Sequence, residues 1–415
     1  MYELLTLPNG VRIVSEPMEA VRSASVGIWV AAGSRCEKRS ENGSAHFIEH
    51  MLFKGTTAHT AKALAQEMDA FGGQCNAFTS RNSTCFYARS PDTHLQRSID
   101  ILAEMFFDSL FDEADVQQER GVILEEIGMY RDSPEDMVSE QLIAGCFPGS
   151  LGRAVLGTPK TLQKLTGASL KSFKEREYRP DRVVISLAGS FTDAHIRSLA
   201  ERFSALEVQK KTRWKKAEYK KATILKRKAT EQNQLCLSWE GLSVEDERRY
   251  AWQLLSTVFG EGLSSRLFQT VREKYGLCYS IGSFTASFEE TGLFGISTAV
   301  SRDTEKKALA LIIDEVRKLL DAGITPQELD RARELIKANL LMSQESTANR
   351  MNRNGSGIMQ LGSVRSVDEV TARYDAVTRE DVRTLAQSLM LPEKLSFSAV
   401  GRIGAEEDYC SILEV

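Results

Sequence analysis

Two histidines and a glutamate stand at helical spacing in the stretch His46-Phe47-Ile48-Glu49-His50. An α-helix has about 3.6 residues per turn, so His46 and His50 share one face and Glu49 lies beside them. Imidazole nitrogens are common zinc ligands, and a carboxylate beside the metal can serve as the base that activates water. The order His-x-x-Glu-His is the inverse of the commoner His-Glu-x-x-His signature. The alternative is a surface helix that happens to carry one acid and two histidines.

A catalytic zinc site needs a third protein ligand, and a second acidic helix is the best source for it. Residues 113–131 predict a helix with glutamates at positions 119, 125 and 126. Glu119 and Glu126 are seven residues apart and share a face, whereas Glu125 points about 100° away. Spacing therefore selects the face but does not say which of the two glutamates binds. The alternative is an acidic face exposed to solvent.

These helices must be positioned by a larger fold, because 415 residues exceed a single hydrophobic core. The sequence around the histidines predicts a hairpin at 2–16, a buried strand at 24–32 and a second hairpin at 74–89. Helices are expected at 60–71, 93–109 and 113–131, and a buried strand at 182–189. This alternation predicts an α+β fold in which a mainly antiparallel sheet is packed by helices.

The second half of the chain repeats the first. Val183–Gly189 matches Leu395–Gly401 at an offset of 212, and the strand that contains Trp29 resembles the one that contains Trp239. An offset near half the length indicates two homologous α/β domains from an internal duplication. We predict a first domain over 1–205, a basic linker over 206–222 and a second domain over 223–415. The counterparts of His46, Glu49 and His50 are Ser256, Phe259 and Gly260, so the second domain is expected to lack a metal site and the chain to bind one Zn²⁺.

Composition narrows the function classes further. The net charge is −4, and no run of about 18 apolar residues predicts a membrane span. Seven scattered cysteines are typical of reduced thiols rather than of a disulfide framework. Residues 210–228 hold ten Lys or Arg against one acid, but they carry few aromatic residues, so we interpret them as a solvated linker and expect no nucleic-acid partner. The start of the chain shows neither a secretory nor an organellar presequence pattern.

These motifs together resemble the inverted-zincin metallopeptidases, a family that includes pitrilysin, the insulin-degrading enzyme and the mitochondrial processing peptidase. The resemblance is carried by His46-x-x-Glu49-His50, by a glutamate 76 positions later, and by the stretches Gly72–Thr79 and Arg272–Tyr279. It spans about residues 2–405. One departure is Gly260-Glu261-Gly262, where an acid interrupts a glycine-rich loop.

The resemblance implies a role for each candidate residue. His46, His50 and Glu126 would hold zinc, Glu49 would be the general base, and Glu119 would orient a histidine. Arg272 and Tyr279 would donate hydrogen bonds to the substrate carbonyl or its oxyanion. Residues Asn76 and Ala77 would bind the backbone of a peptide laid along an exposed strand edge.

The family encloses its substrate between two halves of two domains each. A chain with two domains therefore resembles the short, processing-protease-like branch, in which a second subunit completes the clamshell. Because the zinc motif and the Arg/Tyr pair occur in one chain, we expect a homodimeric endopeptidase of the bacterial cytoplasm that cleaves peptides or unfolded segments. The acid-rich region 104–136 suggests basic peptides. The alternatives are the catalytic subunit of a heteromeric processing peptidase and a non-catalytic structural or binding homologue.

Overall fold

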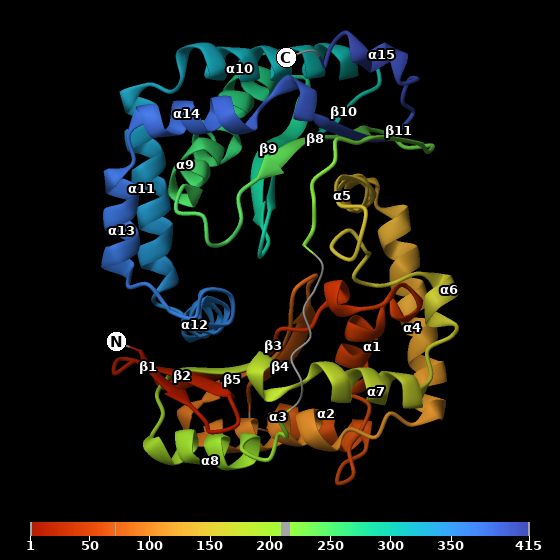
Figure 1. Ribbon diagram of the computed structural model, residues 1–415, viewed down its shortest axis with the longest axis vertical. Coiled ribbons are helices and arrows are strands. Elements are labelled where there is room, and N and C mark those ends of the chain that lie inside the picture. The colour runs from red at the N-terminus through yellow and green to blue at the C-terminus, as the bar shows by residue number, and fades with distance from the viewer. Residues whose placement is uncertain (1, 71, 209–215, 414–415) are drawn as a thin grey trace. The chain divides into compact units, whose positions relative to one another are not determined.

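A computed structural model describes residues 2–70, 72–208 and 216–413 of the chain. The predicted linker 206–222 lies partly outside these residues, since 209–215 are not described. The chain divides into two compact α+β units, each built on one sheet (Figure 1). No described helix is long and apolar enough to span a membrane.

The sheet of the first unit has the strand order β1-β2-β6-β3-β5-β4. Neighbouring strands are antiparallel except for β2 and β6, which are parallel. The strands of this sheet are β1 (Glu3–Thr6), β2 (Arg12–Pro17), β3 (Ser23–Val30), β4 (Gln74–Thr79), β5 (Thr84–Pro91) and β6 (Val183–Gly189). The predicted hairpins and buried strands of the first half agree with these elements. Strands β1 and β4 form the two edges of this sheet.

Helices cover one face of this sheet and enclose the main core of the unit. Helix α3 packs against β3 and β5, and α8 packs against α3 and β2 (Figure 1). The helices that begin in the first half of the chain are α1 (Ser44–Met51), α2 (Ala61–Ala70), α3 (Leu95–Asp108), α4 (Glu113–Asp132), α5 (Pro134–Cys146), α6 (Pro159–Leu162), α7 (Gly167–Glu177) and α8 (Asp193–Phe203).

The second unit repeats the topology with the strand order β7-β11-β8-β10-β9. Its first two strands are again parallel and the others antiparallel, so β7, β11, β8, β10 and β9 correspond to β2, β6, β3, β5 and β4. The bounds of these strands are β7 (Thr223–Arg227), β8 (Asn233–Gly241), β9 (Cys278–Ser287), β10 (Gly292–Val300) and β11 (Ser396–Gly401). The equal topology supports the predicted duplication.

The helices of the second half follow the same order as those of the first. In both halves a helix with a threonine capping box, α7 after Thr166 and α14 after Thr378, precedes the central strand at the offset of 212. The bounds are α9 (Arg249–Gly260), α10 (Glu305–Ala322), α11 (Pro326–Ser343), α12 (Thr347–Leu361), α13 (Val367–Ala376), α14 (Arg379–Leu389) and α15 (Glu407–Cys410).

The compact units differ from the predicted division at the linker, because each includes a segment from the other half. Residues Gly128–Gly152 belong to the second unit and Leu341–Ser366 to the first. Helix α5 therefore packs on β8 and β11, and α12 packs on β3 and β6. Each of these helices covers the sheet face opposite the main core, which explains why β3 and β6 are buried on both faces.

Small residues allow α12 to lie close to its sheet. A Cβ at Gly27 would lie 2.4 Å from Sδ of Met351, and a Cβ at Gly355 would lie 2.3 Å from Nε1 of Trp29. Both distances are shorter than side-chain packing permits, so any larger residue at these two positions would force Met351 or Trp29 to move. This tight packing is not visible as a local pattern in the sequence.

Candidate metal centre

The first unit brings His46, His50 and Glu126 together at one point. Each offers a ligand atom, and these atoms all lie within 4.8 Å of one another. Oε2 of Glu126 is 3.7 Å from Nε2 of His46 and 3.7 Å from Nε2 of His50. This is the single His/Cys/Asp/Glu cluster of metal-binding geometry found among the described residues.

The rotation of α1 is fixed by its apolar residues. Phe47, Ile48 and Met51 are buried in the core of the unit, so the histidine face turns toward α4. His46 is buried and His50 is half-buried. On α4, Ile123 anchors the helix in the same core, and Glu126 lies half-buried one turn further along.

Glu119 contacts the far side of one histidine. Its Oε1 lies 2.8 Å from Nδ1 of His50, and its other oxygen forms an ion pair with Nζ of Lys54. A carboxylate that accepts a hydrogen bond from the Nδ1–H group of His50 keeps the ring proton on Nδ1. The lone pair of Nε2 is then available to a metal. Glu125, in contrast, is exposed. The structure thus gives Glu119 and Glu126 different surroundings, a distinction that helical spacing did not make.

The electrostatics of the cluster suit a cation. Burial, together with the neighbouring His50, lowers the pKa of His46 to about 3, so this imidazole is neutral and can act as a ligand. Burial raises the pKa of Glu126, and His50 opposes that rise. Two imidazoles and a carboxylate are a donor set that zinc accepts, so the residues present fit this metal.

Glu49 lies beside the cluster and is held by the edge strand. Oγ1 of Thr79, the last residue of β4, donates a hydrogen bond of 2.5 Å to Oε2 of Glu49. Burial raises the pKa of Glu49, while the bond from Thr79 and the nearby His50 lower it. A carboxyl group with a raised pKa is better matched to proton transfer near neutral pH.

The predicted peptide-binding residues lie on β4, which pairs with β5 alone among the described strands. Asn76 is exposed, and its Oδ1 accepts a hydrogen bond of 2.8 Å from the Ala77 N–H. That N–H is therefore engaged by a side chain. A peptide added to this edge would have to displace the Asn76 side chain from Ala77 or bond to other groups of the strand.

Arg272 and Tyr279 are placed together in the second unit. Arg272 lies in the π-helical segment Phe268–Lys274 and Tyr279 near the start of β9. The guanidinium carbon of Arg272 is 4.9 Å from the centre of the Tyr279 ring, and Tyr279 is 78% exposed. The pair is therefore stacked, and the exposed Tyr279 is available to a ligand.

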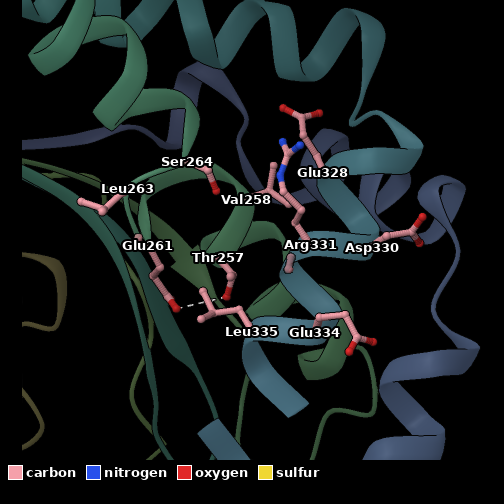
Figure 2. A pocket seen from close by; sticks show the side chains of 12 residues that line it. Thr257, Val258, Glu261, Leu263, Ser264, Glu328, Asp330, Arg331, Glu334 and Leu335 are labelled. Atoms are coloured by element: carbon pink, nitrogen blue, oxygen red, sulfur yellow. Dashed lines mark hydrogen bonds between the residues drawn. The ribbon is translucent and has the colours of Figure 1, made fainter. Parts of the chain in front are cut away.

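The acidic loop residue Glu261 has a structural role. Its carboxylate accepts hydrogen bonds from the side chains of Gln253, Ser256 and Thr257 on α9, and Figure 2 shows the bond from Thr257. It borders a cavity of about 780 Å³ in the second unit. The cavity is lined by Thr257, Val258, Glu261, Gly262, Leu263, Ser264, Glu328, Asp330, Arg331, Ala332, Glu334 and Leu335.

Three of the acids around this cavity are paired with neighbouring cations, and Arg331 adds a positive charge to the lining, opposite in sign to that of Glu261. Glu328, Asp330 and Glu334 form ion pairs with Arg266, Arg333 and Lys337, respectively. The rim therefore has little net charge to attract a ligand of either sign.

Two residues at the metal cluster were not found from the sequence. Lys54 lies four residues after His50, beyond the last turn of α1, and this spacing could have indicated it. Thr79 reaches Glu49 from a strand 30 residues away, and no local pattern indicates such a contact.

Comparisons with known proteins agree with this fold. Residues 12–159 match the family model for insulinase (peptidase family M16), and residues 164–336 match the model for the M16 inactive domain. An uncharacterized zinc protease of Bacillus subtilis, YmxG, is 41% identical, with 94% of this chain and 96% of that protein aligned. A second, SCO5738 of Streptomyces coelicolor, is 38% identical over 95% of this chain and 88% of its own length. The chain belongs to the M16 peptidase family.

Solved structures show the same fold. A protease from Helicobacter pylori has a TM-score of 0.89 at 21% identity and covers 97% of this chain and 99% of its own. An M16 inactive domain from Pseudomonas fluorescens has a TM-score of 0.90 at 21% identity and covers 98% of both chains. The predicted two-domain α+β fold and the predicted family are thus confirmed.

Proposed function

We propose that this protein is a zinc-dependent endopeptidase that hydrolyses peptides or unfolded segments. The observation that carries the proposal is the convergence of His46, His50 and Glu126 within 4.8 Å, with Glu49 beside them. Relatives named as zinc proteases support the same class. His46, His50 and Glu126 would hold the ion.

When bound, zinc supplies Lewis acidity, which makes water a nucleophile near neutral pH. Glu49 takes the proton from the attacking water and then delivers it to the leaving amine. Thr79 orients the Glu49 carboxylate through its hydrogen bond. Glu119, held by Lys54, fixes the ring of His50.

In this proposal, β4 and the Arg272 and Tyr279 pair have substrate-binding roles. The free edge of β4, with Asn76 and Ala77, would bind the peptide backbone as an added strand. Arg272 and Tyr279 would donate hydrogen bonds to the carbonyl oxygen that becomes charged during attack. Two chains would complete a clamshell chamber as a homodimer, a cytoplasmic assembly that admits flexible chains.

A preference for basic peptides has weaker support. Seven of the eleven acids in region 104–136 are exposed, and Glu119 and Glu126 are the two that join the metal cluster. The charges of Glu49, Glu119 and Glu126 would balance those of Lys54 and a zinc ion. Matched peptides that differ in Lys/Arg against Glu/Asp content, compared at low and high salt, test the preference.

The experiment for the proposal as a whole uses the purified single chain. Peptide cleavage should stop when zinc is removed by a chelator and return when one equivalent of Zn²⁺ is added. Activity of the chain by itself would distinguish a homomeric enzyme from a subunit that needs a different partner. Absence of zinc binding would contradict the proposal.

A further inference from the structure

The buried side chain of Glu37 caps the N-terminus of the metal-binding helix α1, although Glu37 lies outside that helix. Glu37 is 3% exposed and lies in the loop that precedes α1. Its Oε1 accepts the N–H of Ala45 at 2.8 Å, and its Oε2 accepts the N–H of Gly43 and Nδ2 of Asn42, both at 2.8 Å. The first N–H groups of a helix have no partner within the helix, so these bonds satisfy donors that would otherwise be lost.

The helix cannot obtain this cap locally. Its N-cap residue is Gly43, which has no side chain and adopts φ +100°, a left-handed conformation that favours glycine. A serine or aspartate at the N-cap usually supplies the missing acceptor. Glu37 supplies it here from six residues upstream, through hydrogen bonds that its two carboxyl oxygens accept.

The carboxylate is held in place by a third segment of the same unit. Nδ2 of Asn42 also donates to the carbonyl oxygen of Ala154 at 2.9 Å, and Arg153 donates to the carbonyl oxygen of Glu37. A Cβ at Gly157 would lie 2.5 Å from the carbonyl oxygen of Asn42, so the two loops pack closely. Glu37 is thus fixed before any ligand binds.

We propose that Glu37 is a positioning residue for the metal centre, because its carboxylate holds the first turn of α1 and so presents His46 in binding geometry. The inference rests on the proposed zinc site. His46 follows Ala45 directly, whereas His50 lies a turn later and is held by Glu119. Loss of the Glu37 carboxylate should therefore free His46 more than His50. Zinc would then bind only the fraction of molecules whose first turn is formed, and its apparent affinity would fall by that fraction.

The test compares Glu37→Gln with a control in the same loop, Glu41→Gln. Glu41 is bound by Arg176 at 2.8 Å rather than by the main chain of α1. Zinc affinity is measured by competition with a chromogenic chelator, at a temperature where circular dichroism shows each variant folded. Glu37→Gln should bind zinc about tenfold more weakly, because an amide NH₂ group replaces one of the two oxygens that accept main-chain N–H groups. Glu41→Gln should stay within about twofold of the wild type. The visible absorption of the Co²⁺-substituted protein should change in Glu37→Gln alone.

A second measurement needs no metal. Amide hydrogen exchange at residues 43–47 of the metal-free protein should be slow in the wild type and faster in Glu37→Gln. If the wild type binds no zinc, the proposed function fails, and the exchange rates still decide the role of Glu37. If Glu37→Gln does not fold, Glu37→Asp replaces it, because it keeps a carboxylate one methylene shorter. Unchanged zinc affinity and exchange, or an Ala45 amide that exchanges freely in the wild type, would overturn the inference.

Discussion

Nδ1 of His50 lies 2.8 Å from Oε1 of Glu119, and the other oxygen of Glu119 is paired with Lys54. The three side chains form a chain of contacts that ends at Nε2 of His50, the ring atom that faces Glu126. Orientation of a ligand histidine by a carboxylate typically matters about 10–100-fold for metal affinity or activity. Lys54 in turn holds Glu119 in position through their ion pair.

Lys54→Met should therefore weaken zinc binding by roughly 10-fold, because Glu119 loses the cation that holds it. Lys54→Arg should restore most of the affinity, since it keeps the charge. The matched control is Lys62→Met, which removes an exposed lysine from α2. Equal zinc affinities of Lys54→Met and Lys62→Met in a chelator competition would show that Lys54 has no such role.

Glu125 and Glu126 are adjacent on α4 but should contribute very differently to zinc affinity. Glu126→Gln removes a ligand and should lower zinc affinity by more than the roughly 10–100-fold typical of an outer partner. Glu125→Gln should leave it unchanged, because Glu125 is exposed. Metal analysis after dialysis measures both. A larger loss in Glu125→Gln would mean that the ligand is assigned to the wrong residue.

The Arg272 and Tyr279 pair should affect turnover and not the metal. We expect Arg272→Gln and Tyr279→Phe each to lower kcat/KM about 100-fold. Removal of one hydrogen-bond donor to the oxyanion that forms during attack typically has an effect of this size. Zinc content should remain at one per chain. Sedimentation during the assay should show a dimer as the active species. A fully active monomer would contradict the clamshell proposal.

Stability at acid pH should depend on the ion pair between Arg266 and Glu328. The two side chains are joined by hydrogen bonds of 2.7 and 2.8 Å. Burial alone would raise the pKa of Glu328, but Arg266 and the N–H of Thr325 lower it to about 2. A carboxyl group with a depressed pKa stabilises the fold above its unfolded pKa and loses that contribution as the pH falls toward its folded pKa.

The wild type should therefore exceed Glu328→Gln by about 2 kcal/mol in unfolding free energy near pH 7, less than the roughly 3.4 kcal/mol of the full pKa change because solvent screens this partly buried pair. The difference should shrink between about pH 4.5 and 2. Denaturant unfolding at several pH values measures it, with Glu393→Gln as an exposed control. A difference that does not change with pH would exclude the ion pair as its cause.

The sequence predicted most of the local structure and the ligand face of the site. His46 and His50 are four residues apart on one short helix, so periodicity was sufficient to bring them together. The contacts of Lys54, Thr79 and Glu37 depend on loop paths and strand edges, which no period in the sequence encodes.

The exchanged helices were missed for a similar reason. Helices α5 and α12 each pack on a sheet built mostly from the other half of the chain. Their patterns indicate that one face is buried but not which sheet covers it. The glycines that permit close packing, Gly27 and Gly355, are 328 positions apart and cannot be paired from one sequence.

The central claim is that Glu49 acts on a proton and does not hold the metal. The most direct measurement is the zinc content and the peptide-cleavage rate of Glu49→Gln, determined on the same preparation beside the wild type. We predict one zinc per chain in both proteins and a kcat that falls by roughly 10²–10⁴-fold in the variant. Loss of zinc from Glu49→Gln, or turnover close to that of the wild type, would contradict the account.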